Sequence, residues 1–257
     1  MNGQDKDKPL LSRRSFIARA CGVVAVAGAG VSARAATNAL VAIKEEARLS
    51  QANPRNATEP FWGRHQGGIL TPLQSHTYFA AFDLVTTKRD DVIKMLRDWT
   101  SAAARMTNGQ SAEPLGQDIS VPGSDTGEAL ELWPARLTIT FGFGPGLFVK
   151  DGQDRFGLAA RRPDALVDLP KFNGDQLVEA RTGGDISVQT CADDPQVAFH
   201  AVRQLARLAA DVAQVRWAQT GFSTKSASQE TPRNLMGFKD GTSNPFINDP
   251  GDMEKFV

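Results

Sequence analysis

The sequence predicts an α+β fold in which an antiparallel sheet carries two helices on one face. Apolar runs of strand length recur along the chain, and two segments repeat apolar residues at helical spacing. These elements follow one another in the order strand, helix, strand, strand, helix, strand. That order is typical of the split βαβ, or ferredoxin-like, plan. Because the plan hosts many activities, it predicts no function by itself.

The first half of the pattern lies between residues 76 and 132. "HTYFAAFDLV" (His76 to Val85) has the apolar content of a buried strand. The segment Lys88 to Met106 follows as a helix, and residues 108–132 are rich in Gly, Pro, Ser and Asp, which predicts a long loop. The apolar residues at helical spacing are Val92, Met95, Leu96, Trp99, Ala103 and Met106.

The second half begins with a strand at Arg136 to Phe141, followed by an irregular stretch at 142–183. Asp194 and Pro195 are typical of a helix N-cap and first helical residue, and the apolar spacing continues to Val212. "QVRWAQTGF" then supplies the last strand. The strand before this helix alternates Ile186, Val188 and Thr190 with Ser187, Gln189 and Cys191.

Composition and charge are those of a globular chain that does not bind nucleic acid. Of 257 residues, 41% are hydrophobic and 23% are charged. Six of the 29 basic and two of the 29 acidic residues lie in residues 1–35, so residues 36–257 carry 23 and 27, a net charge of −4. Nucleic-acid binding requires clustered positive charge, which this balance does not provide.

Residues 1–35 have the features of a twin-arginine export signal. "SRRSFIA" (Ser12 to Ala18) precedes a weakly apolar run at Ala20 to Val31, and Ala33 to Ala35 forms an A-x-A cleavage site. The run is too short to span a hydrocarbon core of about 30 Å as a helix. The alternative is a membrane anchor retained in the mature protein. A twin-arginine signal predicts contact with the Tat export machinery, a periplasmic protein with no stable membrane anchor, and a cofactor inserted before export.

The region after this signal contains one cysteine and one further helical segment. Cys21 lies within the signal, so Cys191 alone remains and can form neither an intramolecular disulfide nor a cysteine-based metal site. We interpret Cys191 as a small buried strand residue. Residues 36–50 are compatible with a short helix.

"RNLMGFKDGTSNP" (Arg233 to Pro245) combines two strong turn signals. Asp240-Gly241 and Asn244-Pro245 are typical of turns, because Gly takes positive φ and Asp bonds its own backbone. Taken alone, the segment is either a surface turn or a loop that presents a catalytic aspartate.

Several blocks of the sequence together resemble the Tat-exported bacterial branch of the dye-decolorizing peroxidases. The last block contains the G-x-x-D-G signature of that family as Gly237 to Gly241. The blocks are "HQGGILTPLQSHTYFAAFDL" (His65 to Leu84), "LTITFGFGPGLF" (Leu137 to Phe148), "GGDISVQTCADDPQVAFHAVRQLAR" (Gly183 to Arg207) and "NLMGFKDGTSNP" (Asn234 to Pro245).

The resemblance implies a haem b peroxidase built from two ferredoxin-like halves, a dimeric α/β barrel of which this chain supplies the first half. In such enzymes the residue matching Asp240 is the distal acid/base that moves a proton between the two oxygens of hydrogen peroxide. Gly237 and Gly241 would let the backbone approach the porphyrin. Gly241, Thr242 and Ser243 are then the expected haem contacts, together with Gly237 and Asp240, and a bulky dye-like or other organic reductant is the second substrate.

The family also implies an axial histidine and a distal arginine, both well beyond the G-x-x-D-G motif. His65, His76 and His200 do not match the ligand position, so we predict structural roles for all three and no metal ligand in this chain. We expect an incomplete chain: a signal at 1–35, a ferredoxin-like domain at 36–225, and at 226–257 the distal loop with the start of a haem-binding domain. Apolar surface made for the second half favours association, including homo-oligomers.

Three further interpretations stay open. Part of this branch is ascribed a deferrochelatase activity, which releases iron from haem and leaves the porphyrin intact. A non-catalytic ferredoxin-like binding module is the other alternative, because no axial ligand is present. Electron exit through Trp133, Trp217 or Tyr78 is also open, with core packing as the competing role for each.

The export assignment predicts that the arginine pair is required. Replacing Arg13 and Arg14 by lysine should leave the precursor in the cytoplasm, because the weakly apolar run cannot direct export without the pair. Cell fractionation and immunoblotting would measure the mature periplasmic form. Normal processing of the double-lysine protein would show that the segment is not a twin-arginine signal.

Overall fold

The computed structural model describes residues 56–116, 123–223, 233–239, 245 and 249–256. These belong to one compact unit that begins at residue 54, and the helix expected at 36–50 lies outside the described residues. In the described part, no helix is long and apolar enough to cross a bilayer. The elements are β1 (His76–Leu84), α3 (Arg89–Met106), β2 (Thr138–Phe143), α4 (Pro145–Phe148), β3 (Ile186–Ala192), α5 (Pro195–Leu208), β4 (Ala213–Phe222) and α6 (Pro250–Phe256), with 3-10 turns at Ala159–Arg161 and Glu179–Arg181.

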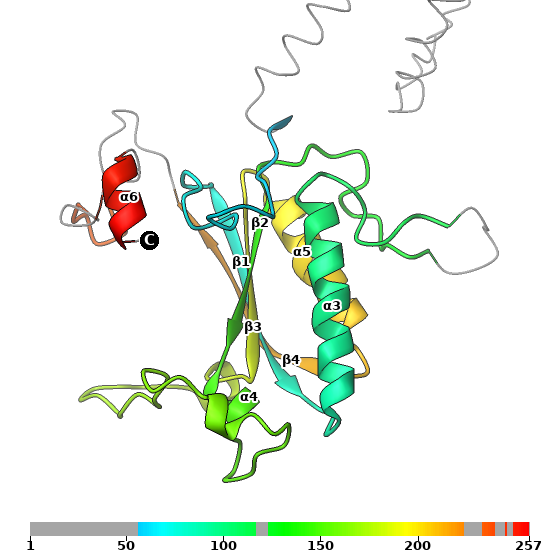
Figure 1. Cartoon of the computed structure of the whole chain (residues 1–257). Helices are drawn as coiled ribbons and strands as arrows, with labels where there is room; N and C mark the ends of the chain where they lie inside the picture. The colour runs from blue at the N-terminus through cyan, green and yellow to red at the C-terminus, as the bar shows by residue number, and fades with distance from the viewer. Residues whose placement is uncertain (1–55, 117–122, 224–232, 240–244, 246–248, 257) are drawn as a thin grey trace, which may run out of the picture. The chain divides into compact units, whose positions relative to one another are not determined.

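The four strands form one antiparallel sheet in the order β2-β3-β1-β4 (Figure 1). β1 pairs with both β3 and β4, so Phe79 lies opposite Gln189 on one side and Gln219 on the other. β2 pairs with β3, which places Phe141 opposite Val188. This is the strand order of the split βαβ plan, and it confirms the predicted ferredoxin-like fold.

α3 and α5 cover the same face of the sheet (Figure 1). The alternation in β3 explains why, since Ile186, Val188 and Thr190 are buried while the residues between them are not. Trp99 of α3 is fully buried, and its ring stacks on Phe141 with 5.5 Å between ring centroids. The helical apolar stripe predicted for residues 88–106 is therefore the core-facing side of α3, although Leu96 is only partly buried.

α5 begins where the sequence predicts and ends four residues earlier. The side chain of Asp194 accepts hydrogen bonds from the backbone N–H groups of Gln196 (2.8 Å) and Val197 (3.4 Å), which confirms the N-cap. The helix ends at Leu208 and not at Val212. Ala209 leaves the helical region, and the N–H of Val212 bonds to the carbonyl of Ala209 in the turn that leads into β4.

β2 begins at Thr138, two residues later than predicted. Arg136 takes a positive φ of 54°, which an extended strand does not allow. Its guanidinium donates to Glu59 Oε1 (2.9 Å) and to the carbonyl oxygen of Pro72 (2.8 Å), and lies 3.3 Å from Asp193 Oδ2. These long-range contacts hold Arg136 in a turn. They could not be predicted from the residues adjacent to Arg136 in the sequence.

The three aromatic residues considered for electron exit occupy different surroundings. Tyr78 is half-buried and meets Phe199 edge-on at 5.8 Å. Trp217 stacks on Phe79 at 5.3 Å, and its Nε1 donates to the carbonyl oxygen of Gly183. Packing therefore accounts for Tyr78 and Trp217, whereas Trp133 is 44% exposed.

Cys191, the cysteine of β3, is half-buried.

The cap of α5 predicts a measurable loss of stability. Asp194→Ala removes the acceptor for two backbone N–H groups and should lower the free energy of unfolding by about 1 kcal/mol, measured by urea denaturation. Asp211→Ala is the matched control, because Asp211 is exposed in the turn after α5. Equal midpoints for the two variants would show that the cap contributes nothing.

Candidate functional site

The segment predicted to carry the distal aspartate begins with a tight turn at residues 233–239. Arg233 and Lys239 form an isolated antiparallel bridge. Inside it, the N–H of Asn234 donates to the carbonyl of Phe238 and the N–H of Gly237 donates to the carbonyl of Asn234, both at 2.9 Å. The side chain of Asn234 also accepts from the N–H groups of Met236 and Phe238. Asn234 therefore organises the turn from within, as asparagine does in Asx turns.

The conformation of Gly237 accounts for this glycine. Its φ is +87°, a region that residues with a side chain rarely adopt, and no atom lies within 4 Å of the position a Cβ would take. The carbonyl of Gly237 accepts a hydrogen bond of 2.8 Å from Arg233 Nη1. The other predicted site residues, namely Asp240, Gly241, Thr242 and Ser243, lie outside the described residues. Their roles, and a haem contact by Gly237, therefore stay predictions.

The turn presents apolar side chains immediately before Asp240. Leu235 is 88% exposed, Met236 82% and Phe238 66%. None of them belongs to the core of the ferredoxin-like domain. An apolar turn of this kind is typical of a surface that contacts another part of a protein or a ligand.

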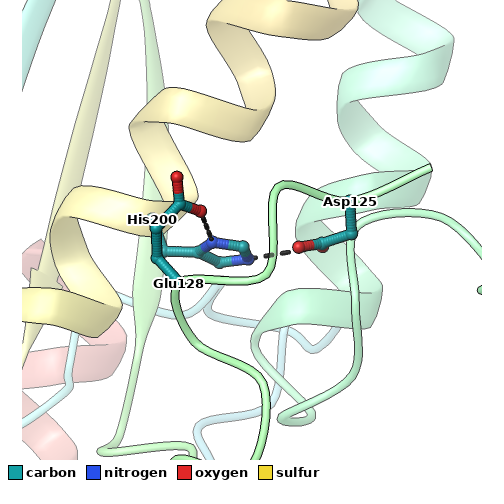
Figure 2. A group of neighbouring side chains, drawn as sticks. All are labelled: Asp125, Glu128 and His200. Atoms are coloured by element: carbon teal, nitrogen blue, oxygen red, sulfur yellow. Dashed lines mark hydrogen bonds and ion pairs between the residues drawn. The ribbon is translucent and has the colours of Figure 1, made fainter. Parts of the chain in front are cut away.

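His200 is a buried residue of α5 that lies between two carboxylates (Figure 2). Its Nδ1 is hydrogen-bonded to Glu128 Oε2 at 2.8 Å, and its Nε2 lies 3.4 Å from Asp125 Oδ2. Both acidic residues belong to the loop between α3 and β2. The structural role predicted for His200 agrees with these contacts, because both ring nitrogens face an acidic partner.

Glu128 is held in its charged form by its neighbours. Burial raises the pKa of Glu128, but hydrogen bonds from Thr126 and His200 outweigh that effect and lower the pKa from 4.5 to about 2. Arg203 Nε lies 2.5 Å from the other carboxylate oxygen of Glu128. Together, Asp125, Glu128 and His200 each place one possible ligand atom within 4.8 Å of the others, so a metal ion must also be considered. The two carboxylates face different ring nitrogens, however, whereas a metal ion takes only one of them.

The other two histidines are half-buried and lie near one another in sequence. His76 opens β1 and pairs with Ala192 and Phe222 in the sheet. His65 lies in the approach segment before β1. Within the described ranges, neither histidine forms a salt bridge, and neither belongs to a group of possible metal ligands.

Asp185 is the centre of a charged cluster that sequence reasoning missed. Its side chain is 3% exposed and accepts hydrogen bonds from the N–H of Leu84 (2.9 Å), from Lys150 Nζ (3.1 Å) and from Arg155 Nη2 (2.9 Å). A Cβ on Gly146 would collide with this carboxylate. The glycines of "GFGPG" and of "GGD" at residues 183–185 could therefore have indicated a place where the backbone passes close to a buried carboxylate.

A family model described as "Dyp-type peroxidase, N-terminal" matches residues 66–223, more than half of the chain. The chain belongs to the Dyp-type peroxidase family. Among curated relatives, the deferrochelatase of Yersinia pseudotuberculosis is 34% identical over 241 residues, which are 92% of this chain and 54% of the relative. The deferrochelatase of Escherichia coli K12 is 37% identical over 208 residues, which are 79% of this chain and 48% of the relative.

Solved structures of the Dyp-type family share the fold. The DyP-type peroxidase of Streptomyces coelicolor superimposes with a TM-score of 0.65 at 40% identity, covering 77% of this chain and 50% of the other. The DyP-type peroxidase of Cellulomonas bogoriensis gives 0.63 at 40% identity, covering 75% and 51%. The chain thus spans about half the length of the relatives that it matches. Its antiparallel sheet and two helices correspond to the N-terminal ferredoxin-like domain of the family.

Two grooves lie on the described part of this Dyp-type domain. One groove of about 710 Å³ runs along the outer side of α3 beside Trp62, and another of about 600 Å³ lies beside Asp83 and Arg216. Neither groove is lined by a histidine, and His200 is engaged by two carboxylates. Neither groove therefore presents a histidine to haem iron, and the predicted haem contacts Gly241, Thr242 and Ser243 lie outside the described residues.

The charge of Glu128 predicts a defined loss of stability in acid. Because its pKa is depressed to about 2, the contribution of Glu128 is present above about pH 4.5 and is lost as the pH falls through about 2. Glu128→Gln should therefore show a shallower decrease in unfolding free energy between pH 5 and pH 3, by roughly 1 kcal/mol per pH unit, in urea titrations. Glu131→Gln, an exposed neighbour on the same loop, should follow the unaltered protein. If all three proteins lose stability in parallel, the ion pairs of Glu128 do not stabilise the fold.

Proposed function

We propose that this chain is part of a haem-dependent peroxidase that reduces hydrogen peroxide and oxidises a bulky, dye-like or other organic reductant. The observation that carries the proposal is the Dyp-type family match over residues 66–223, supported by a TM-score of 0.65 to the Streptomyces coelicolor peroxidase. Ferric DtpA from Streptomyces lividans is a solved relative that is 39% identical, with a TM-score of 0.65. Its ferric state supports an iron cofactor for this family member. We propose haem b as that cofactor.

Asp240 is the proposed acid/base of the reaction. When bound, haem would supply the iron that accepts peroxide. Reduction of peroxide requires one of its oxygens to lose a proton and the other to gain one, and a carboxylate within hydrogen-bond reach of both can transfer it. Asp240 directly follows Lys239, which closes the turn organised by Asn234.

The twin-arginine segment and the exposed apolar turn support proposals for the location and the contacts of the enzyme. The twin-arginine pattern around Arg13 and Arg14 supports export by the Tat machinery to the periplasm. Gly237, Gly241, Thr242 and Ser243 are the proposed haem contacts beside Asp240. The exposed apolar turn at residues 235–238 supports a contact with a further part of the protein or with another copy in a homo-oligomer.

Deferrochelatase activity is the second candidate function. The specific support is that curated relatives at 34% and 37% identity both carry that name. In this reaction haem is the substrate, and the products are iron and intact metal-free porphyrin. A non-catalytic ferredoxin-like module is the third candidate, and the same measurement tests it.

Haem titration of a protein extended to the length of its relatives separates the three candidates. A peroxidase gives a Soret band that changes on addition of peroxide and returns when an organic reductant is oxidised. A deferrochelatase gives rising porphyrin fluorescence together with iron captured by a chelator. The absence of any Soret band would favour the non-catalytic module.

The role of Asp240 predicts a large kinetic effect in that full-length protein. Asp240→Asn keeps the size of the side chain but cannot accept the proton, so the peroxide-dependent spectral change should slow by roughly 100-fold or more in stopped-flow measurements. Asp249→Asn is the matched control, because asparagine preserves the cap that Asp249 provides to the N–H groups of Gly251 and Asp252. An unchanged rate in Asp240→Asn would assign the proton transfer to another group.

A further inference from the structure

One side of α5 carries polar side chains in successive turns. The side chains at positions 196, 200, 203, 204 and 207 recur at the spacing that brings helical residues onto one face. We name this row the α5 polar stripe; its members are Gln196, His200, Arg203, Gln204 and Arg207. Every member contacts the loop between α3 and β2.

The contacts extend over a large part of that loop. Arg207 Nη2 lies 2.6 Å from Glu113 Oε2 and also donates to the carbonyl oxygen of Ser124. Gln204 donates to the hydroxyl of Thr126, and Gln196 Nε2 donates to the carbonyl oxygen of Glu128. In its described residues, 107–116 and 123–137, the loop forms neither a helix nor a strand, and these side-chain contacts attach it to α5.

Asp125 is the member of the loop that most requires a cation. Its side chain is fully buried and accepts hydrogen bonds from the N–H groups of Ala112 (3.0 Å) and Gly127 (2.8 Å), which join two distant parts of the loop. A buried carboxylate is unfavourable without a counter-charge. Within the part of the chain that the structure describes, the only cationic side chain within salt-bridge distance of Asp125 is His200.

Only one member of the α5 polar stripe is of a residue type whose charge changes near neutral pH. The two glutamines are neutral, and Arg203 and Arg207 stay charged at every accessible pH. His200 is the exception, because an imidazole gains or loses its proton in this range. The acidic groups that face it are Asp125 and Glu128, while the positive charges of Arg203 and Arg207 are directed to Glu128 and Glu113. The protonated ring satisfies both acidic groups, whereas a neutral ring leaves Asp125 without a cation.

We propose that His200 is a protonation-dependent fastener of the α3–β2 loop: its imidazolium form holds residues 123–132 against α5, and loss of the proton loosens them. Figure 2 shows the arrangement on which this rests, with the ring of His200 between the carboxylates of Glu128 and Asp125. Protonation of a buried histidine is a known way to switch a packed contact. A rise in pH that removes the ring proton therefore loosens the loop.

Hydrogen exchange by mass spectrometry on the full chain tests this directly. In EDTA, the backbone amides of residues 123–132 should exchange about tenfold faster at pH 8.5 than at pH 6.0, after correction for the intrinsic effect of pH on exchange. Amides in β1 and β3 report global unfolding and should stay equally protected. Equal corrected exchange of the loop at both pH values would overturn the proposal.

Two variants isolate His200 from the other histidines. His200→Gln keeps a hydrogen-bond donor toward Glu128 but has no charge, so its loop should exchange rapidly at both pH values. His65→Gln is the matched control and should keep the pH dependence of the unaltered chain. A pH dependence that persists in His200→Gln would also overturn the proposal.

Nuclear magnetic resonance on the unaltered chain gives a readout that needs no variant. The chain has three histidines, so long-range proton–nitrogen spectra contain three sets of ring signals. The set that is absent from His200→Gln should show both ring nitrogens protonated at pH 6.0; a neutral ring there would contradict the proposal. Addition of zinc chloride in place of EDTA tests the competing interpretation. If zinc slows loop exchange at pH 8.5 only when His200 is present, the cluster is a metal site and the fastener is wrong.

Discussion

The burial of Trp99 is the packing constraint on which the described fold depends. Its indole is fully buried, stacks on Phe141 and meets Phe82 edge-on at 5.3 Å, while Nε1 donates to the carbonyl of Leu205 at 2.8 Å. One side chain of α3 therefore touches β1, β2 and α5. Because the single polar atom of the ring is hydrogen-bonded, its large apolar surface is buried without an unpaired donor. The two helices consequently share one face of the sheet.

The irregular segments around this core are attached by charged side chains. Arg136 fastens the approach segment through Glu59, Asp185 fastens the segment after β2 through Lys150 and Arg155, and the α5 polar stripe fastens the α3–β2 loop. Apolar residues of these segments, such as Ala112, Leu132 and Phe156, also pack on the core, so the ion pairs and hydrogen bonds add to that packing. Removing one partner of a buried pair leaves an uncompensated charge, which makes each of these attachments sensitive to a single change.

The fold was predictable because its signals are local, and the details that escaped prediction are long-range. Alternation in β3 and the Asp194 cap depend on residues close in sequence, and both predictions are confirmed. The predicted start of β2 was wrong, because the conformation of Arg136 depends on contacts with residues more than fifty positions away. Asp185 escaped notice for the same reason, since the N–H that it accepts belongs to Leu84. In the candidate site, Gly237 could be predicted as a turn residue from its sequence context, whereas the role of Asp240 came from family resemblance alone.

His200 shows how the same side chain can serve either ligation or attachment, but not both at once. A histidine that ligates a metal must be neutral and must offer a nitrogen lone pair. In this domain Nδ1 is hydrogen-bonded to Glu128, and Nε2 lies 3.4 Å from the buried carboxylate of Asp125, so both ring nitrogens already face an acidic partner. Ligation of a metal ion by His200 would therefore require one of these two contacts to break. The contacts of His200 thus join α5 to the α3–β2 loop, while the proposed proton chemistry belongs to the segment that begins at Asp240.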